Sequence, residues 1–432
     1  MRPSRRIADR GTFHYRGGEL LCEDVSLRRL AEAVGTPAYV YSGGRLVSRY
    51  QEFDRAFRRY PHRICYSVKA NGNLHLLRLL AKQGSAFDIV SAGELYRVLE
   101  AGGRAARVVF SGVGKTAEEM DYALRAGIML FNCESASELR LLAERASRLH
   151  KKARAAIRVN PHIQARTHPH IATGLREHKF GIEMEAAEEL YRQAQTWPGL
   201  RLEGLSCHIG SQIFDLRPIQ QAVRKLVQLA SRLQKAGLPV RHLDAGGGLG
   251  VAYQPDDAPP TIAAYGQTIL ECMKGSGLEL FVEPGRALVA DSGILLTRVI
   301  RTKTTRTKST GTKTTDSKRF VIVDAAMNDL IRPALYGAYH EIHPVVRARR
   351  GESLADIVGP VCETGDFFAR DRALPELDPG ELLAIFTAGA YGSVLSSNYN
   401  ARPRPVEVLV QGSRWTVARR RESFRDLVRG ES

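Results

Sequence analysis

Several short apolar segments of the chain end in residues that can do chemistry. Lys69, in YSVKAN, has apolar or small neighbours, and a lysine in such surroundings has a lowered pKa and a nucleophilic amine that can form a Schiff base. Alone, a lysine at the end of a strand more often extends its ammonium to solvent. The same kind of position recurs along the chain at Asp88, Arg158, Asn160, His208, Gly246–Gly250 and Glu283–Arg286. We therefore expect these residues to meet at one edge of a common scaffold.

Three of these positions indicate what the scaffold binds. The glycines of GGGLG (246–250) can bring backbone N–H groups against an anion, although the segment does not match a dinucleotide fingerprint. Glu283 can keep a pyridine nitrogen protonated, or it can pair with Arg286. His208 can be a core histidine, a flat surface for a ring or a metal ligand, and no second histidine has metal-ligand spacing nearby, so we expect no metal. A lysine, an anion cradle, a carboxylate and a stacking histidine together are typical of a pyridoxal 5'-phosphate site.

The elements that must position these residues alternate regularly. Eight short, β-branched, apolar segments are separated by segments with helical spacing of apolar residues. Eight such units predict a closed (β/α)8 barrel of the TIM type over residues 43–285, with a doubly wound open sheet as the alternative because periodicity does not prove closure. In a barrel the carboxyl ends of the strands form one mouth. The predicted strands are 63–70, 85–91, 107–112, 128–132, 155–160, 202–210, 240–248 and 278–285.

Outside residues 43–285 the regular alternation of strand-like and helix-like segments stops. After residue 286, strand-like runs lack long helical partners, so residues 1–42 together with 286–432 predict a second, β-rich domain, an antiparallel β-barrel or sandwich. The segment FHYRGGELLCEDV predicts a hairpin around Arg16-Gly17-Gly18 that joins this domain. Residues 301–318 are rich in threonine and lysine and predict a flexible basic insertion at the tip of a hairpin.

Charge and composition restrict the partners. The chain has 432 residues with 63 basic and 46 acidic side chains, a formal net charge of +17. The excess gathers near the N-terminus, in the 301–319 insertion and in the last twenty residues, where no nucleic-acid-reading motif accompanies it. We expect a solvated basic surface and no nucleic-acid partner.

The spacing of the cysteines and the hydropathy of the chain indicate the cellular compartment of the protein. No run of 18 apolar residues is present, which predicts no membrane span, and the N-terminus has no apolar segment typical of a secretory signal. The six cysteines form no CxxC pair and have no metal-ligand spacing with histidines, which favours a reducing compartment. We predict a cytoplasmic protein.

Longer sequence motifs make the chain similar to a known family of proteins. The blocks YSVKAN, THPHIATGLREHKFG, CHIGSQI, LDAGGGLG, FVEPGR, MNDLIRPALYGAYH and GPVCETGDFF make the chain similar to the fold-type III pyridoxal-phosphate decarboxylases, and among them to the diaminopimelate decarboxylases, over roughly residues 12 to 415. The resemblance implies decarboxylation of meso-2,6-diaminopimelate to L-lysine and carbon dioxide, the last step of lysine biosynthesis. It further implies a homodimer in which Cys362 and Glu363 reach into the neighbouring subunit's site.

The resemblance also implies a role for each site residue. Lys69 would carry the internal aldimine and Cys362 would be the proton donor. His208 would stack on the cofactor ring. The remaining cofactor contacts would be Asp88, Arg158, Ser211, Gly248, Glu283, Pro284, Gly285, Arg286 and Tyr391.

The substrate residues follow from the chemistry of diaminopimelate. Its distal end carries a carboxylate, for which Arg286 and Arg332 offer guanidinium groups, and an ammonium, for which Glu363 offers an anion. Tyr336 and Tyr391 could supply hydroxyls. A decarboxylase for ornithine, arginine or carboxynorspermidine is the alternative within the fold, followed by a racemase. A catalytically silent carrier of pyridoxal phosphate is the alternative from another class, although it should have lost Lys69 or Cys362.

Overall fold

The structure is a computed structural model that describes residues 11–163, 179–308 and 315–431. The chain divides into two compact units. The barrel unit comprises Val47–Val251 and Ala258–Leu288, and the β unit comprises Met1–Leu46, Ala252–Asp257 and Val289–Ser432. The domain limits predicted from the sequence, 43–285 and 1–42 with 286–432, stay a prediction.

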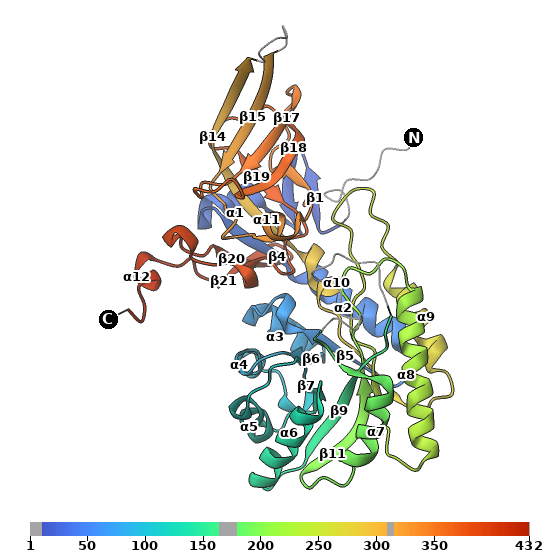
Figure 1. Ribbon diagram of the computed structural model, residues 1–432. Helices are drawn as coiled ribbons and strands as arrows, with labels where there is room; N and C mark the ends of the chain where they lie inside the picture. The colour runs from blue at the N-terminus through green and yellow to red at the C-terminus, as the bar shows by residue number, and fades with distance from the viewer. Residues whose placement is uncertain (1–10, 164–178, 309–314, 432) are drawn as a thin grey trace. The chain divides into compact units, whose positions relative to one another are not determined.

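The barrel unit contains all eight predicted strands, several of which are labelled in Figure 1. Each strand is parallel to its neighbours, the eighth strand pairs with the first, and the fourth pairs with the fifth, so the ring is closed. This confirms the predicted TIM-like barrel over the open sheet. A two-residue strand, β10 (Ile182–Glu183), is added beside the fifth strand. The eight strands are β5 (His62–Ser67), β6 (Ala86–Ile89), β7 (Val108–Phe110), β8 (Leu130–Cys133), β9 (Ala153–Asn160), β11 (Leu200–Ser206), β12 (His242–Asp244) and β13 (Glu279–Val282).

Helices surround these strands (Figure 1). Their starts are set by side-chain caps: Ser91 and Ser135 accept hydrogen bonds from the third residue of their helices, and Thr116 forms a capping box with Glu119. The longest helix buries an apolar stripe that includes Leu226 and Leu233. The helices are α2 (Gly43–Phe57), α3 (Leu74–Lys82), α4 (Ala92–Glu100), α5 (Ala117–Ala126), α6 (Ala136–Arg148), α7 (Met184–Ala194), α8 (Arg217–Lys235) and α9 (Ile262–Met273), followed by the short α10 (Arg286–Val289).

The β unit is built on one large sheet in the order β18-β17-β15-β14-β4-β20-β21, with β19 branching from β14 and β16 paired with β19. The predicted β-rich domain is therefore confirmed, but it is not wholly antiparallel, because β4 and β20 are parallel and so are β15 and β17. The strands are β4 (Ala38–Ser42), β14 (Gly293–Lys308), β15 (Thr315–Val323), β16 (Ile342–Pro344), β17 (Glu352–Val358), β18 (Phe367–Pro375), β19 (Leu382–Ile385), β20 (Val406–Gln411) and β21 (Arg414–Arg419). The unit also contains the helices α1 (Leu27–Val34), α11 (Arg332–Tyr336) and α12 (Phe424–Leu427).

Both predicted hairpins are present in the β unit. β1 (Phe13–Arg16) pairs with β2 (Glu19–Cys22), which also pairs with β3 (Val25–Ser26). Phe13 and Leu20 of this hairpin belong to the same buried apolar cluster as Ile294 and Val408 of the large sheet. β14 and β15 form the second hairpin, paired as far as Lys308 and Thr315, and the predicted insertion includes residues 309–314, which lie outside the described residues. No helix within the described ranges is both long and apolar enough to span a bilayer.

Candidate active site

Lys69 lies at the mouth of the barrel, two residues after the end of β5. It is in a single 3-10 turn, Val68–Ala70, and its side chain is 37% exposed. The Nζ atom donates to Oδ2 of Asp88, at 3.1 Å, and Asp88 in β6 is fully buried. The hydroxyl of Ser67 lies 2.9 Å from the same carboxylate oxygen. The lysine amine is thus held by one buried anion while it remains accessible from the mouth.

Three carboxylates meet at this mouth: Asp88, Asp244 at the end of β12 and Glu283 just after β13. We call them the acid cluster. Asn132 of β8 bridges two of them, because its Nδ2 lies 3.0 Å from Oδ2 of Asp244 and 3.3 Å from Oε1 of Glu283. Burial, reinforced by Asp244 and then Asp88, raises the pKa of Glu283 well above its ordinary value. Glu283 in the cofactor-free protein therefore keeps its proton to a higher pH than an ordinary glutamate does.

Arg158 and His208 lie at the ends of β9 and β11. The Arg158 guanidinium donates to Oε1 of Glu134 at 2.8 Å and to the His208 carbonyl at 3.4 Å. Burial, and then the charges of Arg158 and Lys69, hold the pKa of His208 well below its usual range, so the ring is neutral. Its Nδ1 accepts a hydrogen bond from the backbone N–H of Gly247, at 3.2 Å. The imidazole is therefore fixed in orientation and uncharged.

Glycines follow β12 and β13 at positions where a Cβ would be crowded. Gly248 has a φ of +113°, and a Cβ at this position would lie 2.7 Å from the carbonyl oxygen of Gly210. A Cβ at Gly285 would lie 3.0 Å from the Cβ of Ser67. Arg286 donates from Nε, at 3.2 Å, and from Nη2, at 3.1 Å, to the hydroxyl of Ser211. Backbone without side chains and a guanidinium group therefore occur together here. Backbone N–H groups and guanidinium groups both bind phosphate in proteins.

The other predicted site residues belong to the β unit. Arg332 begins α11, is buried and places its guanidinium carbon 4.8 Å from the centre of the Tyr253 ring. Tyr336 ends the same helix. Cys362 is exposed, whereas the other five cysteines are buried, and the neighbouring Glu363 is exposed and accepts a hydrogen bond from the Tyr399 hydroxyl. The association of these residues and of Tyr391 with Lys69 stays a prediction.

The barrel brings together the predicted residues Lys69, Asp88 and Glu283, and it also brings in residues that the sequence analysis missed. Pro284 and Gly285 follow Glu283 directly after β13, and Arg286 begins α10. The missed residues are Ser111, Asn132, Glu134 and Asp244. Each is a polar residue at the carboxyl end of an apolar strand, the same signal that identified Asp88, so a stricter use of that criterion would have found them.

The mouth fits pyridoxal phosphate on three structural grounds. Glu283 is buried and its pKa is raised, so this carboxyl would suit a pyridine nitrogen, to which it could give its proton and with which it could then pair. Gly248 packs against the Gly210 carbonyl more closely than a Cβ would allow, which brings backbone without a side chain into the site, and Arg286 with Ser211 supplies donors for a phosphate. Lys69 supplies the amine for the aldehyde. Among the described residues, no group of three or more histidine, cysteine or acidic side chains is placed to hold a metal ion.

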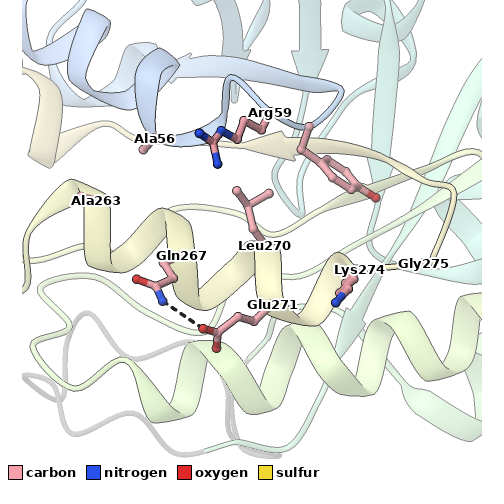
Figure 2. Close-up of a pocket in the computed structure, with 9 residues that line it drawn as sticks. Ala56, Arg59, Ala263, Gln267, Leu270, Glu271, Lys274 and Gly275 are labelled. Atoms are coloured by element: carbon pink, nitrogen blue, oxygen red, sulfur yellow. Dashed lines mark hydrogen bonds between the residues drawn. The ribbon is translucent and has the colours of Figure 1, made fainter.

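A separate pocket of about 560 Å³ lies on the outside of the barrel unit, between α9 and the residues around the end of α2 (Figure 2). It contains none of the predicted site residues. Its lining is formed by Ala56, Arg59, Tyr60, Ala263, Gln267, Leu270, Glu271, Lys274 and Gly275.

Comparisons with known proteins agree with this chemistry. Residues 43–290 match the family described as "Pyridoxal-dependent decarboxylase, pyridoxal binding domain". A diaminopimelate decarboxylase of Pseudomonas aeruginosa is 49% identical over 98% of this chain and 99% of its own. The crystal structure of the Helicobacter pylori diaminopimelate decarboxylase complexed with L-lysine superposes with a TM-score of 0.87 at 42% identity, covering 93% of this chain and 98% of that one. The corresponding M. jannaschii structure in co-complex with L-lysine has a TM-score of 0.90 at 36% identity, over 98% of both chains. The chain therefore belongs to the pyridoxal-dependent decarboxylases and, within them, to the diaminopimelate decarboxylase family.

Proposed function

We propose that this enzyme removes one carboxylate from meso-2,6-diaminopimelate and releases L-lysine, with Lys69 as the residue that binds the cofactor. The observation that carries the proposal is the position of the Lys69 amine, 3.1 Å from the buried Asp88 at the mouth of the barrel. Bound pyridoxal phosphate supplies an electron sink for the electron pair left when carbon dioxide departs. The near full-length likeness to diaminopimelate decarboxylases supports this choice of substrate.

The barrel residues have separate tasks in this proposal. Glu283 keeps the ring nitrogen protonated, and the neutral His208 offers a flat face for the ring, with Asp88 and Arg158 at the ring edge. Ser211, Gly248 and the segment Glu283–Arg286 bind the phosphate. These roles use groups that are already oriented by hydrogen bonds, so little reorganisation is needed when the cofactor binds.

The β unit supplies the substrate contacts. Arg332, together with Arg286, would bind the distal carboxylate, and Glu363 would bind the distal ammonium. The hydroxyls of Tyr336 and Tyr391 would complete the polar lining. Cys362 would donate the proton that replaces the lost carboxylate. An ornithine decarboxylase would need no arginine at the distal end, because its substrate ends in an ammonium alone.

We also propose an obligate homodimer in which Cys362 and Glu363 serve the neighbouring subunit's site. Both residues are exposed in the single chain, which suits contact with a second copy. Mixing the inactive variants Lys69→Ala and Cys362→Ala tests this. Subunit exchange would restore one complete site in each mixed dimer and about a quarter of the wild-type activity. Recovery of no activity after verified exchange would contradict a shared site.

The working compartment is part of the proposal. All six cysteines are free thiols, as a reducing cytoplasm maintains them. This function needs no nucleic-acid partner. We expect a variant that lacks residues 301–318 to retain the same amount of DNA or RNA as the wild type.

The assay for the main proposal is the formation of L-lysine from meso-diaminopimelate by the protein loaded with pyridoxal phosphate. Wild type should form lysine, whereas Lys69→Ala should retain less than about one-thousandth of the rate. Ornithine and arginine in place of diaminopimelate test the alternative substrates. Near-normal turnover by Lys69→Ala would contradict the role of Lys69, and turnover of ornithine or arginine in preference to diaminopimelate would contradict the substrate.

A further inference from the structure

A buried lysine that takes no part in the proposed chemistry lies behind the acid cluster. Lys115 is in the loop between β7 and α5, and none of its side chain is exposed. Its ammonium donates three hydrogen bonds: to the Gly112 carbonyl at 2.7 Å, to the Asn132 carbonyl at 2.8 Å and to Oε1 of Glu138 at 2.5 Å. A lysine ammonium has three donors, so each is used. A buried charge this completely bonded fixes the geometry of whatever it touches.

One branch of these contacts leads to the acid cluster. The carbonyl of Asn132 accepts from Lys115, while the side chain of Asn132 donates to Asp244 and contacts Glu283. The same amide nitrogen lies 3.2 Å from the hydroxyl of Ser111. The position of the Asn132 backbone therefore decides where its amide meets the two carboxylates.

A second branch leads to Arg158. Glu138, at the start of α6, accepts from Lys115 through one oxygen and from the backbone N–H of Glu134 through the other, at 2.8 Å. The Glu134 side chain then binds Arg158 at 2.8 Å and the N–H of Gly181 at 3.1 Å. In Figure 1, α5 and α6 lie side by side next to β7, so these contacts cross between neighbouring elements of the barrel.

We propose that Lys115 is a positioning residue of the decarboxylase, which sets Glu283 through Asn132 and Arg158 through Glu138 and Glu134. This inference rests on the proposed function, in which Glu283 and Arg158 contact the cofactor. The competing explanation is that Lys115 only stabilises the fold. The two differ in what happens to cofactor binding when the charge is removed without destabilising the barrel.

The test uses a charge-balanced pair of variants. Lys115→Met alone leaves the Glu138 carboxylate buried without its cation, so this variant should lower the melting temperature of the cofactor-free protein. The double variant Lys115→Met with Glu138→Gln removes both charges and should recover most of that loss. Lys151→Met, at an exposed lysine of the same unit, is the matched control.

The deciding measurement is the dissociation constant for pyridoxal phosphate, from an absorbance titration, together with the pH dependence of the bound cofactor's absorption band. We expect the double variant to bind the cofactor about 10- to 100-fold more weakly and to show a shifted pH profile, because the acid cluster and Arg158 are no longer held in place. Glu134→Gln, which leaves Lys115 and Glu138 intact, should also weaken binding, and its melting temperature is measured beside it because Arg158 loses its buried anion.

Wild-type dissociation constants and pH profiles in both the double variant and Glu134→Gln would overturn the inference. If the double variant does not fold, the result for Glu134→Gln decides. Failure of the proposed function is a separate outcome, since it would appear in the wild type as absence of cofactor binding or of lysine formation.

Discussion

The substitution Glu283→Gln examines the protonation state of the acid cluster. Burial and the nearby Asp244 raise the pKa of Glu283 well above its ordinary value, so in the folded cofactor-free protein this carboxyl keeps its proton to a higher pH than in the unfolded chain. In the unfolded chain a glutamate ionises near pH 4.5. Glutamine has nearly the same shape and no charge at any pH, so it removes the titration while it keeps the packing.

The magnitude follows from proton linkage. Between the unfolded and the folded pKa of Glu283, the folded protein binds one more proton than the unfolded chain at this site. A carboxyl with a raised pKa therefore makes the wild-type free energy of unfolding fall as pH rises, by about 1.4 kcal/mol for each pH unit. Across that interval the wild type should lose about 1.4 kcal/mol per pH unit relative to Glu283→Gln, and the pH at which this loss stops marks the folded pKa.

The assay is urea unfolding of the cofactor-free proteins at several pH values. Glu279→Gln, on β13 and outside the acid cluster, controls for the removal of one negative charge. Parallel plots of unfolding free energy against pH for wild type and Glu283→Gln would refute the reasoning. With cofactor and substrate present, Glu283→Gln should lower the rate of lysine formation by about 100-fold or more, because in the proposed mechanism only the carboxylate would hold the ring nitrogen protonated.

Three further predictions concern other parts of the chain. Gly248→Ala should weaken pyridoxal phosphate binding about tenfold or more, because the new Cβ would lie 2.7 Å from the Gly210 carbonyl at a φ of +113°; an absorbance titration with the wild-type dissociation constant would contradict this. His242 is stacked on Phe281 with 5.0 Å between ring centres, and burial lowers its pKa from 6.5 to about 4. The unfolded chain is protonated first, so as pH falls from 6.5 to 4 the wild type should lose about 3 kcal/mol of stability that His242→Phe keeps, and equal pH dependence in urea unfolding would count against this. Cys362→Ala should lower the rate of lysine formation about 100- to 10,000-fold while cofactor affinity stays unchanged, and a wild-type rate would exclude Cys362 as the proton donor.

Local patterns were sufficient for much of the fold. Each of the eight barrel strands contains a buried run of the kind that the sequence predicts, such as the run before Lys69, and polar residues at strand ends identified Asp88 and Glu283. Closure of the ring was beyond such patterns, because it depends on the pairing of β8 with β9 and of β13 with β5. The parallel pairs of the β unit join segments far apart in the chain, for example β4 with β20, and no local spacing records such a pairing.

The residues behind the site were harder to predict for the same reason. Asp244 and Asn132 lie at or next to the carboxyl ends of β12 and β8, which marks each as a candidate but does not tell which residue it contacts. Only the barrel brings them within 3.0 Å of one another. Lys115 follows a glycine in a loop whose sequence is typical of an ordinary turn. Its structural role depends on its contact with Glu138, which lies 23 positions later in the sequence.

The central claim is that Lys69 is the residue to which the cofactor is bound. Its most direct test is borohydride reduction of the protein loaded with pyridoxal phosphate, followed by peptide mapping with mass spectrometry. The account predicts a pyridoxyl group on Lys69 and none at this peptide in Lys69→Ala. A label on a different lysine, or no label on a protein that forms lysine, would contradict it.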